Sequence, residues 1–85
     1  MGAKKKTIHG KEYHAIISML RDLRENKNVT QKELADRIDS EQTFISKIET
    51  GERRLDIIEL KNICEALGED LVAFIIRYQE ETKNI

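Results

Sequence analysis

The sequence contains no proline and no tryptophan, and it has only four glycines among its 85 residues. Without proline, every residue keeps the backbone N–H that a helix uses. Glycine, the most flexible residue, is too scarce for long glycine-rich loops. Leu, Ile, Glu and Lys are abundant, and these residues suit helices. The composition therefore predicts an all-α fold.

The chain also has a single cysteine, Cys64, and it lacks any long apolar run. A lone cysteine cannot form an internal disulfide, which agrees with a reducing compartment. A membrane span or a signal peptide needs a longer apolar stretch than any present here. With 39% hydrophobic and 36% charged residues, the composition is that of a globular domain. We therefore expect a cytoplasmic location and no membrane partner.

Patterns typical of catalysis or of metal binding are missing as well. We find no nucleophile near a base, no phosphate-binding glycine-rich loop and no carboxylate pair in an apolar setting. The two histidines, His9 and His14, have no cysteine or acidic partner at zinc-ligand spacing. We expect no enzymatic activity, no cofactor, no metal and no small-molecule effector domain.

The length predicts one domain, residues 11–85, preceded by a flexible basic arm, residues 1–10. The arm contains Lys4, Lys5 and Lys6 and shows no apolar periodicity. Such an arm can follow a phosphate backbone or enter a minor groove, or it can simply improve solubility. Both interpretations stay open.

The net charge of −1 conceals an uneven distribution of charge along the chain. Residues 1–54 contain 12 Lys and Arg against 9 Asp and Glu, whereas residues 55–85 contain 3 against 7. A domain with one face on phosphates and the other on a partner or solvent has this polarity. The distribution modestly favours nucleic-acid binding by the N-terminal part.

The segment 30–51 has the pattern of two short helices joined by a tight turn, a helix-turn-helix. Thr30 and Glu33 have the spacing of a capping box, which begins the first helix. A second helix is predicted from about Glu41 to Thr50, and Gly51 provides the left-handed residue that ends it.

The two faces of this second helix differ in composition. One side is apolar, with Phe44, Ile45 and Ile48. The opposite side carries mostly uncharged donors and acceptors, namely Gln42, Thr43, Ser46, Lys47 and Thr50. Side chains of this kind suit the base edges of a major groove, whereas a solvated helix in so charged a chain would carry Glu and Lys pairs. The pattern favours DNA readout, and the alternative is a polar surface helix with no special role.

Three further helices are predicted around this pair. The first, residues 11–26, carries apolar residues at helical spacing, which are Tyr13, Ile16, Ile17, Leu20 and Leu23. The fourth, residues 56–67, begins with a second capping box, Asp56 and Glu59, and ends before Gly68. Its core face comprises Leu60, Ile63, Cys64 and Leu67.

The fifth helix, residues 71–83, is capped by Asp70 and has more apolar surface than one intradomain face needs. We expect a second copy of the chain to cover the excess, which makes the protein a homodimer. The interface would draw on Val72, Phe74, Ile75, Ile76 and Tyr78. The alternative is that this helix lies deeper in the core.

Together these residues resemble the Cro/cI-like, or XRE, helix-turn-helix regulators of bacteria and phages. The resemblance rests on three motifs, TQKELA at 30–35, FISKIETG at 44–51 and RRLDIIEL at 53–60. It covers roughly residues 13–76 and implies a compact five-helix domain of the lambda-repressor-like DNA-binding fold. Asp39 stands where the family often has a turn glycine, and Glu41 where a small cap residue is usual.

The resemblance also implies roles for particular residues. Arg24 would pair with Glu49 and tie the first helix to the recognition helix. Arg53 and Arg54 would contact the DNA backbone. Independently of the resemblance, Gln31 is expected to contact a phosphate, because it lies at the first turn of its helix, where the N-terminus attracts anions.

These observations predict a dimeric transcriptional regulator that binds double-stranded DNA sequence-specifically at a two-fold operator. Base contacts are expected from Gln42, Thr43, Ser46 and Lys47 in the major groove. The alternative is a helical protein-interaction module, such as an antitoxin-like subunit.

Overall fold

A computed structural model describes residues 10–84 of the chain. These residues form five α-helices, which are α1 (Lys11–Asn26), α2 (Gln31–Arg37), α3 (Gln42–Glu49), α4 (Ile57–Ala66) and α5 (Leu71–Glu81), and no strand. The prediction of an all-α, five-helix domain is confirmed. None of these helices is long and apolar enough to cross a membrane. The lysines Lys4, Lys5 and Lys6 of the predicted arm, and His9, lie outside the described residues.

The helices begin where side chains satisfy free backbone N–H groups. Before α2, the Thr30 hydroxyl accepts from the Glu33 N–H at 3.0 Å, and the Glu33 carboxylate accepts from the Thr30 N–H at 2.9 Å. Asp56 and Glu59 repeat this reciprocal pair before α4, at 2.8 and 3.0 Å. Both predicted capping boxes are confirmed, and each fixes where its helix begins.

Residues with positive φ shape the connections between helices. Gly51 and Gly68 have φ of +82° and +75°, as their positions after α3 and α4 predict. Asp39, in the turn between α2 and α3, has φ of +59°. It therefore adopts the left-handed conformation that a turn glycine would provide, because a short polar side chain tolerates this region better than most.

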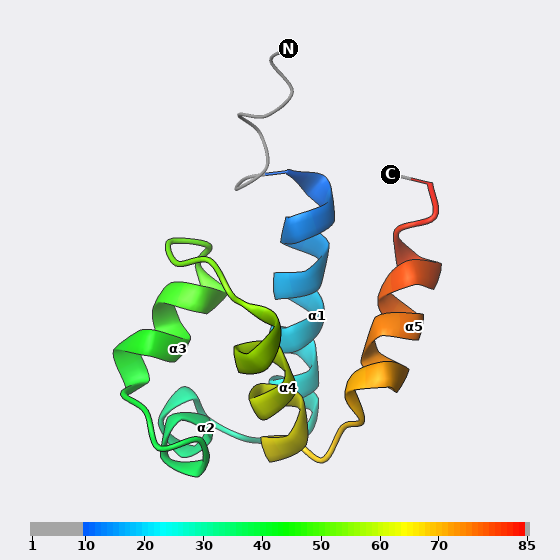
Figure 1. The fold of residues 1–85 in the computed structure, drawn as a ribbon. Helices are drawn as coiled ribbons and strands as arrows, with labels where there is room; N and C mark the ends of the chain where they lie inside the picture. Colours follow the sequence, from blue (N-terminus) through cyan, green and yellow to red (C-terminus); the bar gives the residue numbers. More distant parts are fainter. Residues whose placement is uncertain (1–9, 85) are drawn as a thin grey trace.

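Figure 1 shows how the helices are arranged around α1. The pair α2 and α3 lies on one side of α1, while α5 lies on the other side and α4 lies between them. The core between them is apolar and comprises Ile17, Met19, Leu20, Val29, Leu34, Ala35, Ile45, Ile48, Leu60, Ile63, Cys64, Leu67 and Phe74. The fold thus presents the helix-turn-helix at one edge of the molecule.

Cys64 lies in this core, as predicted, and its side chain is fully buried. Burial raises the pKa of its thiol to about 11, so the thiol is protonated at neutral pH. Cys64 is therefore a small core residue rather than a reactive nucleophile.

The apolar surface of α5 divides between core and solvent. Phe74 is fully buried within its own chain, so its assignment to a dimer interface was wrong. Ile75 and Tyr78 are half-buried against the core. Val72 and Ile76 are 63% and 54% exposed and lie four residues apart on the outer face. The excess apolar surface of this helix therefore consists of Val72 and Ile76.

A second exposed apolar pair lies at the start of α4. Ile57 and Ile58 are 58% and 61% exposed, although the sequence pattern did not single them out. Ile57 lines a groove of about 210 Å³ together with Ile75 of α5 and Leu55 of the preceding loop. The exposed apolar side chains Ile57, Ile58, Val72 and Ile76 are called the α4/α5 patch below.

Candidate nucleic-acid interface

The exposed face of α3 is the centre of the candidate interface. Ile45 and Ile48 are buried in the core, which turns the opposite side of the helix outward. Of the predicted base-contacting residues, Gln42, Thr43 and Lys47 are exposed, whereas Ser46 is half-buried. The structure therefore brings three of the four fully onto one accessible surface, with Ser46 at its margin.

A buried ion pair holds α3 against α1, as the resemblance implied. The Arg24 guanidinium donates through Nε and Nη2 to the two Glu49 carboxylate oxygens, at 2.6 and 3.0 Å. Its Nη1 donates to the Val29 carbonyl at 2.7 Å. The Arg24 and Glu49 side chains are only 9% and 6% exposed. The hydrogen bond with Glu49 raises the pKa of Arg24 above its ordinary value, although burial acts in the opposite direction.

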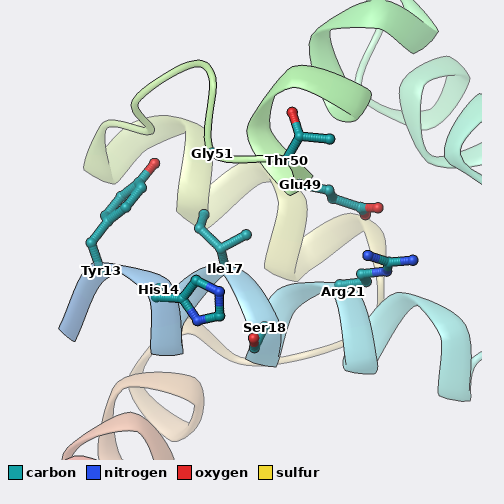
Figure 2. A pocket seen from close by; sticks show the side chains of 8 residues that line it. All are labelled: Tyr13, His14, Ile17, Ser18, Arg21, Glu49, Thr50 and Gly51. Carbon is teal, nitrogen blue, oxygen red and sulfur yellow. The ribbon is translucent and has the colours of Figure 1, made fainter. Parts of the chain in front are cut away.

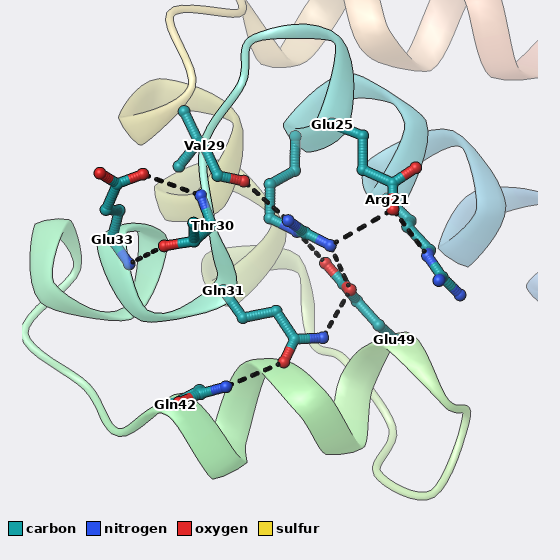
Figure 3. A network of polar contacts seen from close by, with 9 residues as sticks. Arg21, Glu25, Val29, Thr30, Gln31, Glu33, Gln42 and Glu49 are labelled. Carbon is teal, nitrogen blue, oxygen red and sulfur yellow. Dashed lines mark hydrogen bonds and ion pairs between the residues drawn. The ribbon is translucent and has the colours of Figure 1, made fainter.

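The same carboxylate orients a pair of glutamines, as Figure 3 shows. Gln31 Nε2 donates to Glu49 Oε1 at 2.9 Å, and Gln31 Oε1 accepts from Gln42 Nε2 at 3.3 Å. An ionised carboxylate can only accept, so Glu49 fixes which end of the Gln31 amide faces it. The oxygen of Gln31 must then face Gln42. The chain of contacts from Glu49 through Gln31 thus presents the amide of Gln42 in one orientation.

Sequence reasoning assigned Gln31 only to the DNA backbone and did not identify this contact. Gln31 and Gln42 are eleven residues apart and belong to different helices. The packing of α2 on α3 brings their amides together, and no local sequence pattern predicts this contact.

The two arginines after α3 have different surroundings. Both Nη groups of Arg53 donate to the Glu59 carboxylate at 3.0 Å, and its guanidinium lies 4.6 Å from the centre of the Phe44 ring. This pairing raises the pKa of Arg53 and lowers that of Glu59. Arg54 is exposed and lies over the Tyr13 ring, 5.1 Å from its centre. Both arginines are exposed, and within residues 10–84 only Arg53 of the two is paired with a carboxylate.

The link between Arg53 and Glu59 also has a dependence on pH. Because the folded state lowers the pKa of Glu59, the contribution of this carboxylate to stability is present at neutral pH. It is lost as the pH falls through that lowered pKa. Both side chains of the pair remain partly exposed, so the contribution is small.

Acidic residues flank the same surface. Glu41 precedes α3 and makes no side-chain capping bond, and Glu52 accepts a hydrogen bond from the Thr50 hydroxyl at 3.1 Å. The cations Lys47 and Arg54 are exposed in the same part of the chain as these acids. The segment from Glu41 to Arg54 therefore exposes charges of both signs.

Comparisons with known proteins agree with this geometry. A family model described as helix-turn-helix matches residues 20–74. An XRE-family like protein from Pseudomonas syringae pv. tomato str. DC3000 is 41% identical, with a TM-score of 0.84 over 92% of this chain and 95% of that chain. The clp gene regulator ClgR from Corynebacterium glutamicum is 26% identical, with a TM-score of 0.74 over 85% of this chain and 77% of that chain.

A third similar structure is the tetramer of the restriction-modification controller protein C.Esp1396I in complex with its natural 35 base-pair operator. It is 28% identical, with a TM-score of 0.77 over 85% of this chain and 95% of that chain. No curated protein was found to match the sequence. The motifs, the fold and the family match agree, and the chain belongs to the XRE family of helix-turn-helix DNA-binding regulators.

Proposed function

We propose that this DNA-binding transcriptional regulator reads a specific two-fold operator as a homodimer, with α3 in the major groove. The observation that carries the proposal is the exposed face of α3, where the amide of Gln42 is held by Gln31. A polar side chain that is oriented before binding loses less conformational freedom when it meets a base. C.Esp1396I, which has a similar fold, forms a complex with its natural operator as a tetramer, and this supports operator binding by an assembly of several copies.

Gln42 is the residue best placed to read a base. Its Nε2 uses one hydrogen on Gln31, which leaves a second N–H and the Oε1 oxygen for DNA. One donor and one acceptor on an amide match the N7 and N6 groups of adenine in the major groove. Thr43, Ser46 and Lys47 would contact neighbouring bases from the same helix.

Contacts with the DNA backbone would position α3 in the groove. Arg54 is exposed, and it follows Gly51 in the loop beyond α3, where phosphates would pass. Arg53 would have to share its guanidinium between Glu59 and a phosphate. Gln31 lies at the first turn of α2, where free N–H groups attract anions. These residues would supply affinity rather than sequence preference.

A single recognition helix specifies too little sequence to select one site in a genome. It reads about four base pairs, so a useful regulator combines two half-sites, with recognition helices about 34–36 Å apart. The exposed apolar side chains of the α4/α5 patch, together with the groove that Ile57 and Ile75 line, offer a surface through which two copies would associate.

The proposal is tested first at Gln42. We expect Gln42→Ala to weaken binding to an operator selected from a random DNA library by about 1–3 kcal/mol and to relax preference at one base pair. Electrophoretic mobility shifts with the selected site and its single-base variants measure both effects. Gln79→Ala, an exposed glutamine on α5, is the matched control and should bind as the wild type does.

Two results would contradict this assignment. Equal weakening on every sequence would mean that Gln42 touches only the backbone. A wild-type protein that selects no sequence at physiological salt would instead favour the protein-interaction module.

The backbone contacts are tested by salt dependence. Each arginine that contacts a phosphate contributes about one to the slope of log affinity against log salt, through counterion release. We expect Arg54→Ala to lower this slope by about one, and the double variant Arg53→Ala/Arg54→Ala to lower it by up to about two. Arg77→Ala removes a similar charge from α5, away from α3, and should leave the slope unchanged. If the slope of log affinity against log salt is unchanged in the double variant, neither arginine contacts a phosphate.

A further inference from the structure

The hydroxyl of Tyr13 connects α1 to the loop that follows the recognition helix. It donates to the Arg53 carbonyl at 3.3 Å and accepts from the Leu55 N–H at 3.1 Å. These two backbone groups lie 40 and 42 residues away in the sequence. One hydroxyl therefore satisfies a donor and an acceptor on either side of Arg54.

The ring of Tyr13 also contacts Arg54 itself. The guanidinium lies over the ring, 5.1 Å from its centre, a geometry in which the face of the ring attracts the cation. Tyr13 thus holds both the backbone that carries Arg54 and the charged end of its side chain.

Tyr13 and Leu55 pack against the edge of the core, and cavities lie beside them. Figure 2 shows Tyr13 at the edge of a cavity of about 310 Å³ between α1 and the end of α3, with Thr50 and Gly51 on the opposite side. Tyr13 also lines the groove formed with Leu55 and Ile57. The two hydroxyl bonds therefore add directional contacts to a ring that already packs against the core.

The other fixed point of the loop is Arg53, whose guanidinium is held by Glu59 and Phe44. In the sequence, Arg54 lies between Arg53 and Leu55, whose backbone N–H donates to the Tyr13 hydroxyl. We propose that Tyr13 is a positioning residue for DNA binding, which fixes the loop between α3 and α4 so that Arg54 is aimed at a backbone phosphate. The inference rests on the proposed function, because it assigns Arg54 to the DNA interface.

The test is Tyr13→Phe, which removes the hydroxyl and keeps the ring. We expect operator affinity to fall roughly three- to tenfold, the effect of losing a net hydrogen bond or two. The decisive measurement is a double-mutant cycle with Arg54→Ala. If Tyr13 acts through Arg54, Tyr13→Phe/Arg54→Ala binds no more weakly than Arg54→Ala alone.

Thr82→Val is the matched control, since it removes one hydroxyl that donates to a backbone carbonyl at the end of α5. It should leave operator affinity unchanged. Additive losses in the cycle, or wild-type affinity of Tyr13→Phe or of Arg54→Ala, would overturn the inference.

A second measurement separates this inference from the proposed function, because it needs no DNA. Hydrogen exchange of the Leu55 amide in the free protein should become faster in Tyr13→Phe and not in Thr82→Val. Unchanged protection of the Leu55 amide would contradict the positioning role of Tyr13 even if the protein binds its operator. Faster exchange of this amide in Tyr13→Phe, combined with a wild-type protein that selects no DNA sequence, would support the contact between Tyr13 and the loop and reject the proposed function.

Discussion

Replacing Glu49 by alanine should lower the free energy of unfolding by about 3–5 kcal/mol, because it leaves the guanidinium of Arg24 buried without its counter-charge. Both side chains are almost fully covered by protein in the native structure, so the guanidinium depends on this carboxylate for its counter-charge. The amide of Gln31 loses its acceptor in the same variant. Urea denaturation followed by circular dichroism measures the change.

Two further variants serve as controls for this experiment. One removes an exposed ion pair, and the other removes both buried charges. Asp36→Ala breaks the exposed pair with Lys32 and should cost less than about 1 kcal/mol. The double variant Arg24→Met/Glu49→Leu removes both charges and should recover part of the loss, because apolar residues of similar size often replace a buried pair without penalty. The recovery is partial because the Val29 carbonyl and the Gln31 amide still lose their partners. A Glu49→Ala variant as stable as Asp36→Ala would show that the pair is effectively hydrated.

Placing a charge in the α4/α5 patch should abolish dimerisation and reduce operator affinity by about 10² to 10⁴, the advantage that linking two binding modules provides. In Ile76→Glu the carboxylate would lie within the proposed interface, where it would lose water without gaining a partner. Ile76 is half exposed in the single chain, so the monomer should keep its helical content. Sedimentation and circular dichroism measure association and folding separately.

Asn62→Glu adds the same charge to an exposed position of α4 outside the patch and controls for general repulsion from DNA. It should remain a dimer. If the wild-type protein is monomeric at high micromolar concentration and on its operator, the patch has another role and the two-fold mode of binding fails.

The sequence predicted the helices well because their ends depend on local chemistry. Thr30 with Glu33, and Asp56 with Glu59, are capping pairs within three residues of each other, and both form as expected. The apolar periodicity of α1 and α4 likewise identified their buried faces. Met19 was missed because it lies beside the predicted stripe rather than within it, yet it is buried.

Features that depend on packing between helices were harder to predict. The apolar stripe of α5 is broad, and periodicity does not tell which side of it the rest of the chain covers. Phe74 and Val72 were therefore grouped together, although one is fully buried and the other mostly exposed. Likewise, Glu59 was recognised as a capping residue, but its pairing with Arg53 depends on the path of the intervening loop.

The contacts of Gln42 bear on how related regulators can acquire new operators. Gln42 shares its amide with Gln31, which in turn is held by the buried Glu49. Within residues 10–84, the side chains of Thr43 and Lys47 make no such bond, and both are exposed. Substitutions at these two positions can therefore change base preference at little cost to the fold. A substitution at Gln42 also removes the hydrogen bond that the Gln31 side chain accepts. Divergence of binding sites should begin at Thr43 and Lys47 and reach Gln42 only together with Gln31.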